Sequence, residues 1–297
     1  MRDSFARHAR ALLPCLWFLL LCALLVGCAG LPGSSGNTSA SALRLRIASS
    51  PALLPLLSAA VALFERQHSG AQIAVQRDES IDGLSALAHQ QVAIASTVLY
   101  ANPSAAFAAH LRDELFGVVP YVIVVQHAAP QASLSQGQIQ RIFSTGLITD
   151  WRQIDGPKQK LVVVLPPLTS DTAILFREEM LGGAAELGNA LSADSLETLR
   201  DMVARTPGSI GYLPAPWLNA GVHAVGIDGE AATAEQIASG TYGFWAFAHL
   251  YTWDTSQHET EETTLFLQFM QSSAVAQLAL QLGYIPLSEM HAASVSI

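Results

Sequence analysis

The chain has 297 residues, of which 51% are hydrophobic and only 13% are charged, and its formal net charge is −9. This length is ample for a buried core in one or two domains, and the apolar composition argues against a disordered protein. Because the balance is acidic and the only lysines are Lys158 and Lys160, the chain lacks clustered positive charge, and we exclude nucleic acid as a partner.

The N-terminus has the pattern of a secretory signal. Basic residues precede an uncharged apolar run over residues 11–26, which is shorter than the ~20 residues that a membrane-spanning helix needs. The run ends in Leu-Val-Gly followed by Cys28, a sequence that resembles a bacterial lipobox. The resemblance implies that residues 1–27 are a lipoprotein signal peptide and that Cys28 is lipidated. The alternative is a plain signal peptide or a membrane anchor with a chance cysteine.

Cysteine usage agrees with export. Cys15 and Cys22 would leave with the signal, so the mature chain keeps only Cys28 and has no cysteine pair for an internal disulfide. Residues 28–42 contain a stretch rich in Gly, Ser, Asn and Thr, which predicts a flexible tether. We therefore expect an anchored domain that depends on its hydrophobic core alone.

Beyond the tether, strand and helix patterns alternate along the chain. Strands are predicted over residues 43–47, 72–76, 92–97, 117–126, 161–165, 209–213 and 244–252. Helices are predicted over residues 52–67, 80–89 and 134–143, and a further helix opens at 169–172. The alternation predicts an α/β fold with a largely parallel sheet, and two consecutive units of similar size predict two lobes.

Three junctions between a predicted strand and a predicted helix carry hydroxyl side chains. The hydroxyls belong to Ser49 and Ser50, to Ser80, and to Thr169, Ser170 and Thr172. A helix N-terminus presents free N–H groups that favour an anion, and ligands of α/β sheets lie beyond the carboxyl ends of the strands. Each junction taken singly is also explained as an ordinary helix cap. Taken together, they indicate an anion site.

Several segments resemble phosphate ABC-transporter substrate-binding proteins. Residues 134–144, followed by the Ile-Thr-Asp of 148–150 and Trp151, resemble the family's lobe-crossing helix and Trp loop. Gly-Ser-Ile-Gly-Tyr at 208–212, Tyr-Gly-Phe-Trp at 242–245 and Gly-Tyr-Ile-Pro at 283–286 resemble further family segments, in the same order. The resemblance implies a two-lobed periplasmic-binding-protein fold, each lobe a mostly parallel sheet flanked by helices, joined by two crossover strands. Lobe 1 is expected over 43–126 plus 241–297, and lobe 2 over 127–240.

The resemblance also implies a function and a set of binding residues. Carried over by position, the family's binding loops fall at Ser49, Ser50, Ser80, Ser170, Asp171 and Thr172. We expect these residues to hold phosphate or a related small oxyanion without a metal or cofactor, and to deliver it to the permease of an ABC transporter. The protein would be a monomer in the periplasm or cell envelope, attached to a membrane through Cys28.

The chain departs from the family at charged positions. Asp171 and Ala173 stand where the family has glycine and arginine, and Pro166, Ala93 and Ala246 stand at or near further charged positions. A carboxylate ~4 Å from an anion repels it by ~4 kcal/mol at an effective dielectric of 20, although it can accept a hydrogen bond from a protonated phosphate. The alternative hypothesis is a degenerate binding protein that acts as an envelope interaction or sensory lipoprotein without tight ligand binding.

The patterns of metal sites and of nucleophilic catalysis are missing from the sequence. The histidines never pair at i,i+2, i,i+3 or i,i+4, and there is no Gly-x-Ser-x-Gly motif. We therefore expect neither a metal nor an enzyme. A hydrolase on the same fold would need a serine and a histidine within ~3 Å.

Overall fold

The structure is a computed structural model that describes residues 44–126, 132–254 and 260–290. All of them belong to one compact unit, residues 42–297. The predicted signal peptide over 1–27, the lipidation at Cys28 and the whole tether over 28–42 fall outside the described residues.

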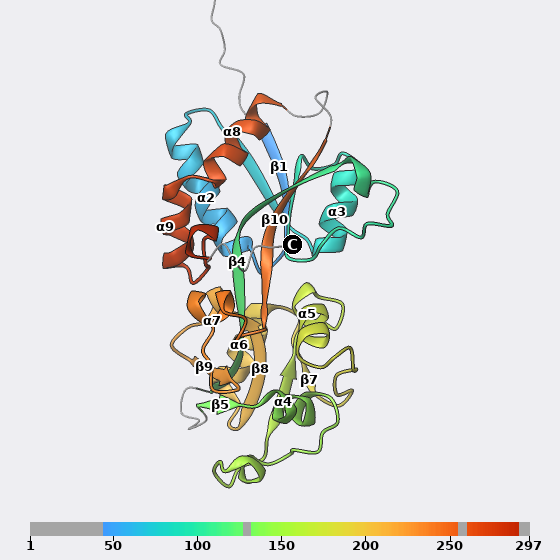
Figure 1. The fold of residues 1–297 in the computed structure, drawn as a ribbon, viewed down its shortest axis with the longest axis vertical. Helices are drawn as coiled ribbons and strands as arrows, with labels where there is room; N and C mark the ends of the chain where they lie inside the picture. Colours follow the sequence, from blue (N-terminus) through green and yellow to red (C-terminus); the bar gives the residue numbers. More distant parts are fainter. Residues whose placement is uncertain (1–43, 127–131, 255–259, 291–297) are drawn as a thin grey trace, which may run out of the picture. The chain divides into compact units, whose positions relative to one another are not determined.

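The first lobe is a mixed sheet with helices on both faces (Figure 1). Its strand order is β2-β1-β3-β10-β4, in which the first three strands are parallel and β10 is antiparallel to both of its neighbours. Helices α2, α8 and α9 pack together on one face, and α3 lies on the other. The strands are β1 (Arg44–Ser49), β2 (Gln72–Arg77), β3 (Ile94–Thr97), β4 (Leu111–Gln126) and β10 (Trp245–Trp253), and the helices are α2 (Leu54–Gln67), α3 (Ser80–Ala88), α8 (Glu261–Met270) and α9 (Ser273–Gln281).

The second lobe is built around the other half of β4. There β4 pairs antiparallel with β8 and β9, while β6 runs parallel to β7 and β8, and β5 runs parallel to β9. Its strands are β5 (Ser133–Leu134), β6 (Val162–Leu165), β7 (Leu191–Ser192), β8 (Ser209–Pro214) and β9 (Val222–Ile227), and its helices are α4 (Gln136–Phe143), α5 (Asp171–Glu179), α6 (Leu196–Arg205) and α7 (Ala234–Ala238).

Strands β4 and β10 join the two lobes. Residues 111–120 of β4 pair with β10, and residues 121–126 pair with β8 and β9, so one strand contributes to both sheets. The chain crosses again where β10 begins at Trp245, opposite Pro120. The predicted two-lobed α/β fold with crossover strands is confirmed, but its sheets are mixed and not mostly parallel, because β4 and β10 pair antiparallel with their neighbours.

The predicted elements are present, and one of them is longer than expected. β4 begins at Leu111, six residues before the predicted start at Gly117. The added segment contains Arg112, Asp113 and Glu114, whose polar side chains hide the strand pattern, yet their backbone pairs with β10. Pairing with a neighbouring strand therefore decides the conformation of this segment, since its own side chains do not indicate a strand.

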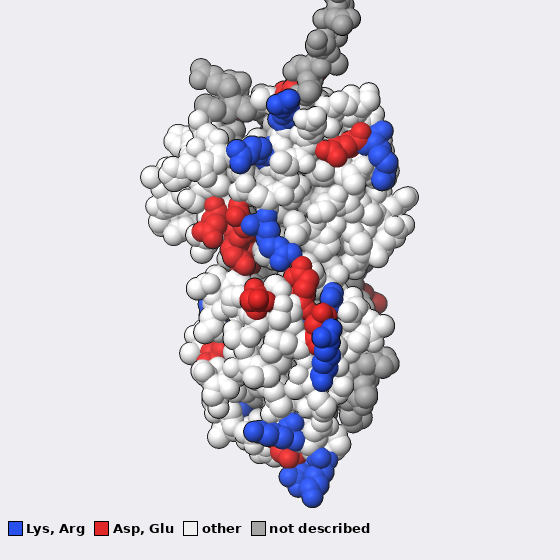
Figure 2. Space-filling model, turned by 180° about the vertical axis from the view of Figure 1, so that it is seen from behind, with Lys and Arg blue, Asp and Glu red and all other residues white. Residues whose placement is uncertain are grey.

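The described chain also contains four short 3-10 helices. They are η1 (Ala108–His110), η2 (Trp151–Ile154), η3 (Ala215–Trp217) and η4 (Leu287–Glu289). No helix within the described ranges has the length and apolar character needed to cross a membrane. On the face shown in Figure 2, basic and acidic side chains lie side by side among a largely uncharged surface, unlike the clustered positive charge of a nucleic-acid-binding surface.

Candidate anion-binding site

The three predicted hydroxyl junctions lie at the ends of strands that face one another across the two lobes. β1 ends in the loop of Ser50, β2 is followed by Ser80 at the start of α3, and β6 is followed by Ser170 at the cap of α5. The N-termini of α3 and α5 meet directly, because Asp171 at the first position of α5 contacts Ser80 at the first position of α3. The junctions therefore form one site.

The carboxylate of Asp171 lies at the centre of this site. It accepts hydrogen bonds from Ser50 Oγ at 2.6 Å and from Ser80 Oγ at 2.6 Å. The backbone N–H of Ser80 donates to both of its oxygens, at 2.9 and 3.0 Å. Two of the hydroxyls that the sequence predicts for an oxyanion, those of Ser50 and Ser80, thus donate to a carboxylate of the chain.

A second carboxylate makes the reciprocal contact. The backbone N–H of Asp171 donates to Glu79 Oε2 at 2.8 Å, and Glu79 is the N-cap residue of α3. Each of the two helix N-termini is thus bonded to a carboxylate that belongs to the other lobe. Such placement is favourable because the N-terminal end of a helix carries partial positive charge.

Burial raises the pKa of both carboxyl groups. The pKa of Glu79 is raised to about 7, first by burial and then by the charge of Asp171. Burial also raises the pKa of Asp171, and the hydrogen bonds from Ser50 and Ser80 oppose that shift. Two carboxylates this close favour a state in which the pair shares one proton, which Glu79 holds more readily.

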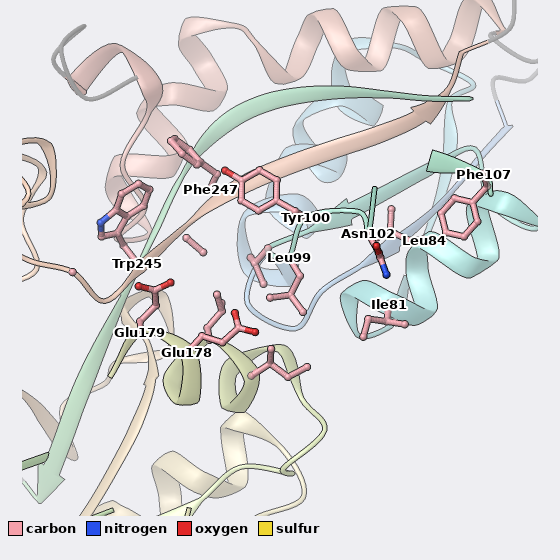
Figure 3. A pocket seen from close by; sticks show the side chains of 15 residues that line it. Ile81, Leu84, Leu99, Tyr100, Asn102, Phe107, Glu178, Glu179, Trp245 and Phe247 are labelled. Carbon is pink, nitrogen blue, oxygen red and sulfur yellow. The ribbon is translucent and has the colours of Figure 1, made fainter. Parts of the chain in front are cut away.

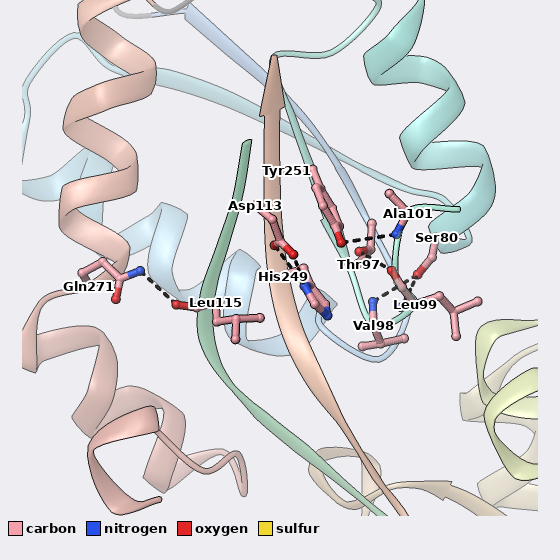
Figure 4. A network of polar contacts seen from close by, with 10 residues as sticks. All are labelled: Ser80, Thr97, Val98, Leu99, Ala101, Asp113, Leu115, His249, Tyr251 and Gln271. Carbon is pink, nitrogen blue, oxygen red and sulfur yellow. Dashed lines mark hydrogen bonds and ion pairs between the residues drawn. The ribbon is translucent and has the colours of Figure 1, made fainter. Parts of the chain in front are cut away.

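Further polar groups surround the pair. Ser80 Oγ accepts from the N–H groups of Val98 and Leu99, at 3.1 and 3.3 Å, which holds it in place as a donor to Asp171 (Figure 4). The hydroxyl of Tyr121, on β4, is fully buried and has no partner in hydrogen-bonding geometry among the described residues. Its pKa is raised well above its usual value by burial and then by Asp171, so it remains a neutral donor near the site.

The predicted residues separate into two groups. Ser50, Ser80 and Asp171 are brought together, as described above. Ser49 Oγ instead donates to the carbonyl of Ser50, and Ser170 Oγ accepts from Ala173 N as an ordinary N-cap of α5. Thr172 is buried and lines a small cavity of about 70 Å³ together with Ser170.

Sequence reasoning missed Glu79, Arg77 and Tyr121. Glu79 immediately precedes Ser80, so its position before a helix was visible, but its partner is 92 residues away in sequence. Arg77 lines the small cavity and pairs with Glu197 of α6 at 2.6 Å, which links the two lobes. Tyr121 is hidden in an apolar strand, where nothing in the sequence marks its hydroxyl.

A larger and mainly apolar cavity of about 670 Å³ adjoins the lobe-joining strand β10 (Figure 3). Its lining includes Tyr100, Trp245 and Phe247 from the first lobe and β10. From α5 it includes Glu178 and Glu179. Ala246 is also in its lining. Neither lysine nor arginine is among the lining residues, so the cavity has no charge complementary to an oxyanion.

His249 on β10 is the buried histidine of the first lobe. Its Nδ1 bonds to the Asp113 carboxylate at 2.9 Å, and its Nε2 has no partner in the described part of the chain (Figure 4). His249 packs between Tyr100 and Tyr251, so it is a core residue with one polar anchor. Among the described residues, no group of three or more His, Cys, Asp or Glu is placed to hold a metal ion.

Comparisons with known proteins agree with the fold. Residues 35–274 match the model of the PBP superfamily domain. The chain is 32% identical over 249 residues to the phosphate-binding protein PstS of Bacillus subtilis (strain 168), across 83% of this chain and 81% of that protein.

Solved structures are also similar. A candidate phosphate ABC transporter substrate-binding protein from Clostridium perfringens, with bound phosphate, gives a TM-score of 0.75 at 21% identity, over 82% of this chain and 99% of that one. An ABC-type phosphate transport receptor from Vibrio cholerae gives 0.67 at 25% identity, over 81% and 99% of the two chains. The fold is therefore shared along nearly the whole of both solved chains.

Proposed function

Because the chain belongs to the PBP superfamily and to the family of the Bacillus subtilis phosphate-binding protein PstS, we propose that it is a solute-binding protein for phosphate or a related small oxyanion. The ligand would lie between the lobes, near Ser50, Ser80 and the start of α5. It would favour the closed state through contacts with both lobes, and closure would hinge on β4 and β10.

One observation carries this proposal: hydroxyl and backbone donors from two loops of the first lobe converge on a single anionic group at facing helix N-termini. The anionic group is the Asp171 carboxylate, and its donors are Ser50 Oγ, Ser80 Oγ and Ser80 N. A convergent set of this kind suits an oxyanion, because charge-assisted hydrogen bonds replace the water that the ion loses. Ser49, Ser170 and Thr172 complete the proposed binding loops.

The proposal extends to location and partners. We place the protein outside the cytoplasm, with residues 1–27 as a signal peptide and a lipid on Cys28, and with residues 28–42 as the tether. It would act as a monomer and deliver its ligand to the permease of an ABC transporter. We propose residues 43–126 with 241–297 as lobe 1 and 127–240 as lobe 2, with residues 121–126 of β4 also contributing to the sheet of lobe 2. The relatives are named as binding proteins and transport receptors, and we propose no catalytic activity.

The test is isothermal titration of sodium phosphate into the full chain in detergent, with sodium sulfate as the comparison. Ser50→Ala removes one charge-assisted donor, so we expect about tenfold weaker phosphate binding or more. Ser239→Ala, an exposed serine of the second lobe, is the matched control and leaves the affinity unchanged. Absence of phosphate-dependent heat from the folded wild type at millimolar concentration contradicts the proposal.

A second candidate is a degenerate binding protein that acts as an envelope interaction or sensory lipoprotein. The observation in its favour is that a carboxylate of the chain already uses the donors of the site. Permease and ATPase genes beside this gene would support transport, whereas neighbouring secretion or sensor genes would support the second candidate.

A further inference from the structure

The donors of the anion site already bind an anion that is part of the chain. Asp171 is only 1% exposed. Its carboxylate accepts hydrogen bonds from the hydroxyl of Ser50 and from the hydroxyl and N–H of Ser80. While these hydrogen bonds persist, an incoming oxyanion has none of these donors available. The carboxylate therefore occupies the place of a ligand.

The same hydrogen bonds connect the two lobes. Asp171 begins α5 of the second lobe, whereas Ser50 and Ser80 belong to the first and are 121 and 91 residues away in sequence. Glu79 of the first lobe accepts in return from the N–H of Asp171. A solute that closes two lobes must contact both of them, and Asp171 makes contacts of that kind from within the protein.

We propose that Asp171 is a built-in ligand that competes with free anions for this site: its carboxylate joins the lobes when no solute is bound, and a free oxyanion binds only by displacing it. Only hydrogen bonds are exchanged in this step. The competition with phosphate rests on the proposed function, whereas the joining of the lobes by Asp171 is independent of it.

The size of the effect follows from the occupancy of the site. The apparent affinity for a free ligand falls by the fraction of molecules whose site is open, so a carboxylate that occupies the donors in about 90% of molecules weakens binding about tenfold. Tethering favours high occupancy, because the carboxylate is always close to its donors. Loss of the tethered carboxylate is therefore expected to strengthen phosphate binding by about tenfold or more.

The first measurement is the distance between spin labels in the two lobes without phosphate. Labels are attached to cysteines replacing Ser85 on α3 and Asn189 in the second lobe, both exposed, in a full chain whose native cysteines are serine. We expect one short distance in the wild type and a longer, broader distribution in Asp171→Ala. Asp155→Asn, which removes an exposed carboxylate at the end of η2 in the second lobe, is the matched control and keeps the short distance.

The second measurement is phosphate titration of the same three proteins. Tighter binding by Asp171→Ala than by the wild type and Asp155→Asn supports the competition, and equal affinities overturn it. An unchanged distance distribution in Asp171→Ala overturns the inference that Asp171 joins the lobes. If no variant binds phosphate, the proposed function fails and the distances still decide the inference. Should Asp171→Ala not fold, Asp171→Asn preserves the shape and removes the charge, and the same comparisons apply.

Discussion

The pH dependence of stability offers a quantitative test of the paired carboxylates, through the substitution Glu79→Gln. The pKa of Glu79 is raised from 4.5 to about 7 in the folded protein. The folded state therefore holds a proton that the unfolded state releases between these values. The stabilisation is fully present below pH ~4.5 and is lost as the pH rises through ~7, so the free energy of unfolding decreases with rising pH.

The size of this change in the free energy of unfolding follows from the same two pKa values. A rise from 4.5 to about 7 corresponds to ~3.4 kcal/mol at ~1.36 kcal/mol per pKa unit. Glu79 is only half-buried, so solvent screening reduces this figure, and we expect roughly 1.5 kcal/mol. The wild type should lose about that much more stability than Glu79→Gln between pH 5 and pH 8, because glutamine does not titrate.

The assay is urea denaturation followed by tryptophan fluorescence at pH 5, 6, 7 and 8. Glu289→Gln, which removes an exposed carboxylate in η4, is the control and should keep the wild-type pH dependence. If Glu79→Gln and the wild type lose stability in parallel across this range, Glu79 does not carry the proton and the description of the pair is wrong.

Three further predictions concern contacts outside the carboxylate pair. Trp151→Phe removes the 2.9 Å hydrogen bond from Trp151 Nε1 to the carbonyl of Gly208 and is expected to lower the free energy of unfolding by about 1 kcal/mol, measured by urea denaturation. Gly208→Ala should cost about 2–4 kcal/mol in the same assay, because Gly208 has φ +77° and a Cβ there would collide with the carbonyl of Lys160; a change below ~1 kcal/mol would contradict this. Arg77→Ala removes an exposed ion pair with Glu197, so we expect under ~1 kcal/mol in stability, measured by thermal unfolding at low and high salt, and a larger loss would show that this pair is a principal link between the lobes.

Local features of the sequence were sufficient for most of the elements. Ser135 and Ser170 cap helices α4 and α5 as their positions suggest, because a capping hydroxyl bonds to an N–H only three residues away. The family segments identified the two-lobed arrangement as well. The hydroxyl junctions were predicted for the same reason as the caps, since strand ends and helix starts are marked by residues close in sequence.

The internal arrangement of the site was decided by tertiary structure alone. Nothing near Asp171 in sequence indicates that its carboxylate reaches Ser50 and Ser80, and the sequence equally allowed it to face an incoming ion. Glu79 and Tyr121 entered the site in the same way, through strands and helices brought together from distant parts of the chain. Contacts between residues so far apart in sequence depend on how the two lobes close on each other. The carboxylates are buried and the two helix N-termini are aligned only once both lobes are folded.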